Sequence, residues 1–190
     1  MGRVVVTEFM SVDGVIEDPG GSENFERGGW AFQFERGEEG DKFKMDEVFE
    51  AEGQLLGRVT YDGFAEAWPS REDPMGFADR MNSMPKYVVS NTLESAEWNN
   101  TTVLKGDVAE EVGRLKESSD GDLLVAGSAQ LVQALTDAGL VDEYRLMVFP
   151  VVLGGGKHLF GERGDAAGLQ LAETRPAGEC TILIYEPRRA

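Results

Sequence analysis

The chain of 190 residues is nearly free of two residue types on which many active sites depend. It has one cysteine, Cys180, and one histidine, His158. One cysteine excludes an internal disulfide and a zinc site built from several cysteines. One histidine argues against a serine–histidine hydrolase and against a histidine-rich metal centre, so we expect no metal. Cys180 begins an apolar stretch and is expected to be a buried structural thiol.

Basic side chains are also scarce. Lys and Arg total 18 against 35 Asp and Glu, which gives a formal net charge of −17 and a pI of about 4.4. So acidic a surface repels phosphate backbones and anionic lipid, so we expect neither nucleic acid nor membrane as a partner. Solubility or ionic adaptation explains the charge equally well. A site for a phosphorylated ligand must then create its own positive patch.

Long hydrophobic runs are absent. Met1 is followed by Val4-Val5-Val6, which is too short for an export signal or a membrane span and shows no cleavage-site pattern. This segment suits an N-terminal strand. We therefore expect a cytoplasmic protein.

Short apolar runs bounded by turn residues recur along the chain and predict strands. Most are continuous rather than alternating, as in strands that are covered on both faces. They span 3–10, 53–57, 86–91, 101–105, 122–127, 143–152 and 180–186. Helical patterns lie between most of them, which predicts an α/β fold with a central, mostly parallel sheet. The last two runs lack a clear intervening helix and predict antiparallel strands near the C-terminus. No linker or repeat divides 1–190, so we expect a single domain.

Capping residues mark the helices. Asp107 can cap a helix with Glu110 at its third position, and Ser128 can cap another that Gly139 ends. A helix starting at Thr60 is expected to end at Trp68-Pro69, and a shorter one covers 46–51. Segments 18–40 and 70–85 are expected to be loops, and loops of this length are plausible pocket walls.

Three strand-to-helix turns share one design. They are Gly57-Arg58-Val59-Thr60-Tyr61, Ser90-Asn91 and Gly127-Ser128. Because parallel strands end at the same edge of a sheet, the three turns can form one shelf of backbone N–H groups and hydroxyls. A helix N-terminus offers unpaired N–H groups and a partial positive charge to an anion. Together the turns predict a dinucleotide site, although each alone could be an ordinary turn.

With these turns placed, nearly the whole chain resembles the dihydrofolate-reductase-like superfamily. The nearest branch is that of the reductase domain of the bifunctional riboflavin-synthesis deaminase-reductase. The resemblance rests on Ser11-Val12-Asp13-Gly14, Leu56 to Tyr61, Pro85 to Ser90, Val125-Ala126-Gly127-Ser128, Leu140 to Leu146, and Pro150 to Lys157. It implies a dihydrofolate-reductase-like sheet that binds NADPH across the strand ends, and subunits that pair as a homodimer.

The resemblance also assigns residues to NADPH. Gly57, Arg58 and Thr60 match the adenosine-phosphate turn, with Arg58 on the 2′-phosphate and Thr60 on the pyrophosphate. Ser90 and Asn91 match the turn beside the adenine ribose. Gly127, Ser128, Ala129, Gln130 and Leu131 match the second pyrophosphate turn. The segment Phe9 to Ile16 would run along the nicotinamide, with Asp13 and Gly14 in the mobile loop over it. For Arg58, a surface salt bridge is the alternative.

The substrate side is less defined. Dihydrofolate reductases carry a carboxylate on the first helix, and Asp41 has roughly the matching separation from Gly57, with Asp46 and Glu47 as rivals. Riboflavin-pathway reductases often have an acidic residue where this chain has Val125. Two further features remain open. Trp30, Phe32 and Phe34 suit either walls for a flat substrate or an aromatic cluster under a loop. The stretch from Gly154 to His158 lacks the following helix of a phosphate loop and favours a flexible hairpin connection.

These observations predict an NADPH-dependent oxidoreductase that acts on a pteridine-like, pyrimidine or related heterocycle, of the dihydrofolate reductase or riboflavin-pathway type. The cofactor carries the hydride, and the protein positions it. The alternative is a dinucleotide- or ligand-binding protein that kept the fold and lost efficient turnover. An acidic interaction module explains the charge but not the three turns.

Overall fold

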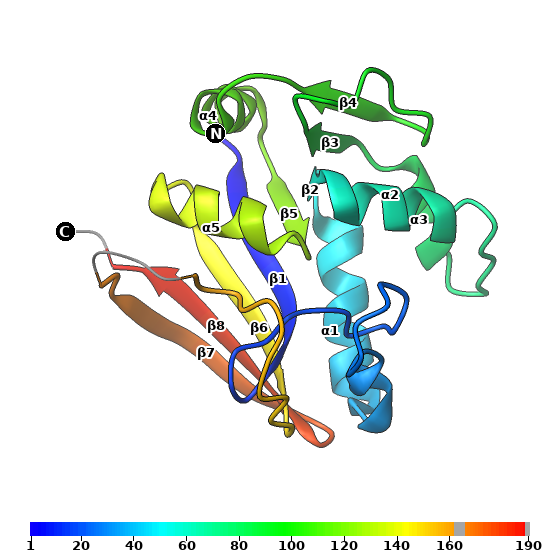
Figure 1. Ribbon diagram of the computed structural model, residues 1–190, viewed down its shortest axis with the longest axis vertical. Coiled ribbons are helices and arrows are strands. Elements are labelled where there is room, and N and C mark those ends of the chain that lie inside the picture. The colour runs from blue at the N-terminus through cyan, green and yellow to red at the C-terminus, as the bar shows by residue number, and fades with distance from the viewer. Residues whose placement is uncertain (162–165, 189–190) are drawn as a thin grey trace.

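A single eight-stranded sheet forms the centre of the computed structural model, which describes residues 1–161 and 166–188 (Figure 1). Its strands are β1 (Arg3–Ser11), β2 (Gly53–Gly57), β3 (Lys86–Val89), β4 (Thr101–Leu104), β5 (Asp122–Ala126), β6 (Glu143–Phe149), β7 (Leu169–Ala177) and β8 (Cys180–Pro187). Their order is β4-β3-β2-β5-β1-β6-β8-β7. The first six are parallel, whereas β8 is antiparallel to β6 and to β7. The expected fold class is confirmed.

Helices cover the two faces of this sheet. They are η1 (Trp30–Gln33), α1 (Gly37–Glu50), α2 (Arg58–Ala67), α3 (Phe77–Ser83), α4 (Val108–Ser118) and α5 (Ala129–Asp137). Alternate residues of β1 point to opposite faces. Val4 and Val6 share a core with α4 and α5, whereas Val5 shares one with α1, α2 and α3. A third core, with Trp30, Phe43 and Phe149, lies beside β6 and β8. The apolar runs are continuous because both faces of the sheet are covered.

The structure corrects several expected boundaries. The expected loops 18–40 and 70–85 contain η1, the first turn of α1, and α3. The expected short helix at 46–51 is the end of the longer α1, whose first turn is acidic and glycine-rich. The helix expected from Thr60 begins two residues earlier, and β6 ends at Phe149 rather than at 152. Strand β7 was missed because it is a mostly exposed edge strand with alternating polar residues and lacks an apolar run.

Two capping predictions have different outcomes. Asp107 caps α4, since its carboxylate accepts hydrogen bonds from the backbone N–H groups of Ala109 (2.9 Å) and Glu110 (3.1 Å). Ser128 does precede α5, but its hydroxyl makes no capping hydrogen bond to that helix. Gly139 follows the end of α5 with a φ of +66°, as expected for a stop.

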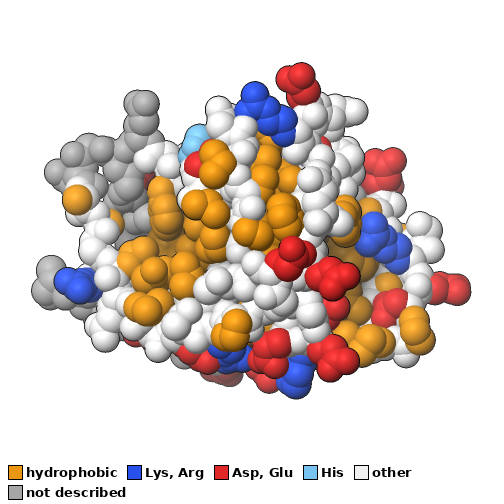
Figure 2. All heavy atoms as spheres, turned by 90° about the horizontal axis from the view of Figure 1, so that it is seen from below, with side chains coloured by type: hydrophobic (Ala, Val, Ile, Leu, Met, Phe, Trp, Pro, Cys, Tyr) orange, Lys and Arg blue, Asp and Glu red, His pale blue; other side chains and the backbone are white. Residues whose placement is uncertain are grey.

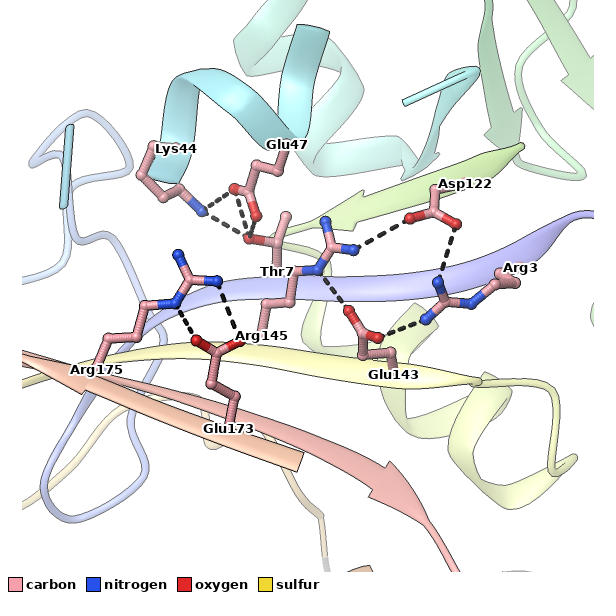
Figure 3. A network of polar contacts seen from close by, with 9 residues as sticks. All are labelled: Arg3, Thr7, Lys44, Glu47, Asp122, Glu143, Arg145, Glu173 and Arg175. Atoms are coloured by element: carbon pink, nitrogen blue, oxygen red, sulfur yellow. Dashed lines mark hydrogen bonds and ion pairs between the residues drawn. The ribbon is translucent and has the colours of Figure 1, made fainter. Parts of the chain in front are cut away.

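The amino ends of β1, β5 and β6 are joined by charged side chains. Arg145 donates to Glu143 (2.6 Å) and Asp122 (3.1 Å), and Arg3 bridges the same two carboxylates (Figure 3). This network lies at the amino ends of these strands, and the three turns lie at the opposite, carboxyl ends. Among the residues that the structure describes, no helix is both long and apolar enough to cross a membrane.

Candidate functional site

The turns after β2 and β5 are joined directly through one hydroxyl group. Ser128 Oγ accepts the backbone N–H of Gly57 (2.9 Å) and donates to Thr60 Oγ1 (2.7 Å). Ser128 has a left-handed backbone with a φ of +65°, which turns its side chain away from α5 and toward β2. The structure therefore brings Gly57, Thr60 and Ser128 together at one edge. We name the group Gly57, Thr60, Gly127 and Ser128 the shelf.

At both glycines of the shelf the neighbouring turn packs so closely that a side chain would collide with it. A Cβ atom on Gly57 would lie 2.9 Å from Ser128 Oγ, and one on Gly127 would lie 3.0 Å from Thr60 Oγ1. Gly127 also has a φ of +66°, a conformation that L side chains rarely adopt. Helices α2 and α5 both start at the shelf, and neither N-cap residue, Gly57 or Ser128, caps its own helix with a side chain. Bare glycine backbone and two uncapped helix N-termini form a donor set that fits a pyrophosphate.

The other residues of the second turn differ in exposure. Ala129 and Leu131 are buried and belong to the core under α5, whereas Gln130 is exposed. Ala129 and Leu131 can therefore offer only backbone N–H groups to a ligand at the shelf. Val125 is also fully buried in this core.

Arg58 makes a salt bridge on the surface of α2. Its Nε donates to both carboxylate oxygens of Asp62 (2.9 and 2.7 Å), and both side chains are about half exposed. This i,i+4 pair is the alternative considered from the sequence. Arg58 directly follows Gly57 of the shelf, and its salt bridge to Asp62 lies along the surface of α2. The role of Arg58 at a 2′-phosphate stays a prediction.

Ser90 and Asn91 form a turn at the carboxyl end of β3. Ser90 Oγ accepts the backbone N–H of Leu93 (3.1 Å), and Asn91 Oδ1 accepts that of Gly106 (2.7 Å). Since Val89 pairs with Gly57 in the parallel register, this turn lies at the same edge as the shelf. The three turns therefore share one edge of the sheet, as their positions in the sequence predict.

The loop after β1 is tied to the glycine loop after β6. The Asp13 carboxylate accepts hydrogen bonds from Ser11 Oγ (2.6 Å) and from the backbone N–H groups of Leu153 (3.1 Å) and Gly154 (2.7 Å). These donors lower the pKa of Asp13 to about 2. Gly14 has a φ of +83°, and its carbonyl oxygen accepts the N–H of Leu159 (3.0 Å). Two loops far apart in the sequence thus form one unit next to the end of β1.

A pocket of about 390 Å³ lies between β1 and the start of α1. Phe9, Phe32, Phe34, Arg36 and Asp41 are among its lining residues. Phe32 is 81% exposed, and the Phe34 ring meets that of Phe149 edge-on. Trp30 instead is buried against Phe149 (ring centroids 5.4 Å apart). Trp30 therefore belongs to an aromatic cluster in the core, whereas Phe32 and Phe34 line a pocket. Their role as walls for a flat substrate stays a prediction.

The three candidate carboxylates of α1 have very different surroundings. The Asp41 side chain is 63% exposed and pairs with Arg36 (2.7 Å), and Asp46 is 46% exposed. Glu47 is only 2% exposed. It accepts the hydroxyl of Thr7 on β1 (2.7 and 2.9 Å) and pairs with Lys44, which also donates to Thr7 (2.6 Å; Figure 3). Asp41 lines the aromatic pocket, whereas Glu47 is the buried carboxylate. The catalytic role of Asp41 stays a prediction.

The carboxyl group of Glu8 in β1 is buried, and the sequence did not single it out. The residue is 4% exposed, and burial raises the pKa of its carboxyl group to about 8. It accepts a backbone hydrogen bond from Gly127 of the shelf, whereas its Oε1 has no hydrogen-bond partner. The signal that could have indicated it is a glutamate within a run of β-branched and apolar strand residues. The apolar residues on both sides predict a strand but do not show that this glutamate is buried.

The face of the molecule at the carboxyl ends of β1 and β6 is rich in hydrophobic side chains. Figure 2 views the molecule from this end and shows them gathered across the middle, with most charged side chains around them. A larger cavity of about 750 Å³ lies beside α2 and is lined by Tyr61, Trp98 and three carboxylates, Asp62, Glu66 and Glu97. These carboxylates disfavour a phosphorylated ligand there. The shelf and the apolar end are the better candidate.

The chain is similar to known proteins over nearly its whole length. The protein YyaP of Bacillus subtilis (strain 168) is 30% identical over 185 residues, which cover 96% of this chain and 93% of YyaP. A solved structure from Shewanella sp. PV-4, whose name links it to riboflavin biosynthesis, is 22% identical with a TM-score of 0.77 and covers 98% of this chain and 99% of that one. A pyrimidine reductase-like protein from Corynebacterium diphtheriae is 13% identical with a TM-score of 0.66, at 99% and 92% coverage.

The two structural similarities show a shared fold over the whole chain. The family is identified by sequence, because the model of the RibD C-terminal domain matches residues 3–183, from the first residue of β1 into β8. That family is a reductase family. The chain belongs to the RibD C-terminal domain family.

Proposed function

We propose that this protein is an NADPH-dependent reductase of a pteridine-like, pyrimidine or related heterocyclic substrate. The observation that carries the proposal is the shelf, where Ser128 joins two glycine turns at the N-termini of α2 and α5. Membership in a reductase family supports it. The pyrimidine reductase-like name of one structural neighbour fits the same substrate class.

In this proposal the chain holds the cofactor along one edge of the sheet. The backbone N–H groups at Ser128, Ala129, Gln130 and Leu131 and the hydroxyl of Thr60 hold the pyrophosphate, and Gly127 lets it approach the backbone closely. Arg58 holds the 2′-phosphate, after its guanidinium turns from Asp62. Ser90 and Asn91 lie by the adenine ribose, and Asp13 and Gly14 cover the nicotinamide. When bound, NADPH supplies a hydride to the substrate.

The substrate would occupy the α1 side of β1. Phe34 and Phe9 offer apolar surfaces to a flat ring, and Asp41 in the same pocket offers a carboxylate that orients a polar edge of the ring. Arg36, the present partner of Asp41, would be displaced or shared. The proton of the reduction comes from this carboxylate or from water that it orders.

Cofactor choice is the first test. Arg58→Ala should weaken NADPH binding about tenfold to a hundredfold, because a charge-assisted hydrogen bond contributes roughly 1.5–3 kcal/mol. NADH binding should change little. Arg114→Ala is a matched control, since Arg114 also pairs with carboxylates on an exposed helix face, that of α4. An equal loss for both cofactors would remove Arg58 from the 2′-phosphate.

Turnover is the second test. NADPH oxidation should be measured with dihydropteridines, ribosylamino-pyrimidines and related heterocycles. Oxidation that depends on one of them supports the reductase. Tight NADPH binding without oxidation in the whole panel would favour the alternative, a dinucleotide-binding protein on this fold.

We also propose that two copies of the chain form a homodimer. The 142–152 segment carries four large apolar residues close to one another near its end: Val148, Phe149, Val151 and Val152. Phe149 is fully buried within the chain, whereas Val152 is 70% exposed and Leu171 of the edge strand β7 is 48% exposed. Light scattering at micromolar concentration should give twice the 20.8 kDa chain mass. A monomer mass would contradict the dimer.

A further inference from the structure

Glu8 carries a carboxyl group that lies buried against the shelf. Successive residues of β1 point to opposite faces: Thr7 contacts Glu47 of α1, whereas Glu8 lies on the α5 side with Val4 and Val6. A hydrogen bond from the Gly127 backbone holds its carboxyl group at the start of α5. Glu8 therefore lies between the proposed pyrophosphate turn and the segment Phe9 to Ile16.

The surroundings of Glu8 favour a neutral carboxyl group. Burial disfavours the carboxylate, and the charges nearest to it are mixed: Lys44 and Glu47 on α1, and Glu23 in the loop after β1. A neutral carboxyl group has one O–H donor and acceptor capacity on both oxygens. Only the bond from Gly127 occupies it, and its Oε1 is buried without a partner. Leaving such a group unpaired costs free energy, so a partner is expected in the functional state.

We propose that Glu8 binds the carboxamide of the nicotinamide ring, donating a hydrogen bond to the carboxamide oxygen and accepting one from its NH₂ group. The inference rests on the proposed function, because it requires a nicotinamide cofactor on the shelf. A carboxamide fits because it offers an acceptor and a donor side by side, the complement of a neutral carboxyl group. Because the Glu8 side chain is buried, the segments that cover it must move apart before the nicotinamide ring can reach it.

The experiment compares two ligands that share everything but the nicotinamide end. NADPH contains the carboxamide, and 2′-phospho-ADP-ribose does not. Glu8→Leu should weaken NADPH binding by about tenfold or more and leave the affinity for 2′-phospho-ADP-ribose within about twofold. Glu8→Gln keeps one donor and one acceptor and should retain most of the NADPH affinity. Glu110→Gln on the exposed face of α4 is the control and should bind both ligands like the parent.

A pH series adds a second readout. In the parent, NADPH affinity should fall as pH rises through about 8, when Glu8 loses its proton. In Glu8→Gln this decrease should be absent. In the parent, the affinity for 2′-phospho-ADP-ribose should decrease less over this pH range than the affinity for NADPH.

The outcomes separate the two proposals. If the parent binds neither ligand, the proposed function fails. If the parent binds both and Glu8→Leu weakens both equally, or weakens neither, the carboxamide contact is wrong while the cofactor site stands. If Glu8→Leu does not fold, the pH series with Glu8→Gln decides: a decrease identical to that of the parent overturns the contact.

Discussion

The shelf and helix α1 both carry polar residues toward the candidate site, but they specify it in different ways. At the shelf, each residue has a geometric task. Glycine is needed because a side chain at Gly57 or Gly127 would collide with the neighbouring turn. Ser128 joins the two turns through its hydroxyl group. Helix α1 instead offers several carboxylates, of which Asp41 and Asp46 are exposed and only Glu47 is buried. Chemically similar residues thus have different surroundings because of the face on which they lie.

This difference shows how local and tertiary structure share the site. A turn at a strand end is fixed by its own residues, so it is visible in the sequence. The surroundings of a carboxylate on a helix depend on the face on which it lies, and residues within one turn lie on different faces. Helix α1 buries one of its faces against β1. The four predictions below test this comparison.

The largest effect should come from Glu8 at the shelf. Burial raises its pKa from 4.5 to about 8, so the folded state holds the proton more tightly than the unfolded state. The resulting stabilisation is fully present below the unfolded pKa and is lost as pH rises through about 8. The free energy of unfolding of the parent, relative to Glu8→Gln, should fall by several kcal/mol between pH 5 and pH 8, because one pKa unit corresponds to about 1.4 kcal/mol. Urea unfolding of both proteins from pH 5 to pH 9 measures it, and parallel profiles would contradict a buried, titrating Glu8.

The next largest effect should come from Lys44 on α1. Lys44→Met leaves the buried Glu47 carboxylate without its cation, which should lower the free energy of unfolding by about 3 kcal/mol at neutral pH. Lys42→Met removes a similar pair, Lys42 with Asp46, on the exposed face of the same helix, and should leave urea unfolding unchanged. Equal effects of the two substitutions would break the distinction between the faces of α1.

Gly127→Ala should have an intermediate effect. The left-handed backbone strains any L side chain by about 1–2 kcal/mol, and the added methyl group also crowds Thr60. Gly139→Ala is a matched control, because Gly139 has the same φ of +66° but no atom within 4 Å of the added Cβ. Both substitutions should destabilise the protein in urea, and only Gly127→Ala should weaken NADPH binding. Equal NADPH affinities would remove Gly127 from the cofactor site.

The smallest effect on stability should come from Asp41→Asn. Its pair with Arg36 is largely exposed, so the free energy of unfolding should change by less than about 1 kcal/mol. If Asp41 orients the substrate, turnover falls while NADPH binding stays the same. Asp46→Asn is the control on the same helix. Parent-like turnover in both variants would make Glu47 or water the remaining source of the proton.

Much of the fold was predictable because its signals are local. Continuous apolar runs predict strands that are covered on both faces, and seven of the eight strands follow such runs. Asp107 with Glu110 predicts the start of α4, since a cap needs only the next three residues. Strand β7 has no such signal. It forms a strand because its backbone pairs with β8, and its own side-chain pattern does not indicate this.

The parallel sheet, the three turns and the strand ends at which they meet were predictable from the sequence, because alternating strand and helix patterns and glycine turns are visible in short segments. The tertiary structure decided which carboxyl groups are buried. Glu47 is buried because α1 packs on β1 with that face. Glu8 is buried on the other face of β1, where the backbone of Gly127, in the turn after β5, donates to its carboxyl group. Burial is a property of the assembled chain, and the pKa of a carboxyl group follows burial.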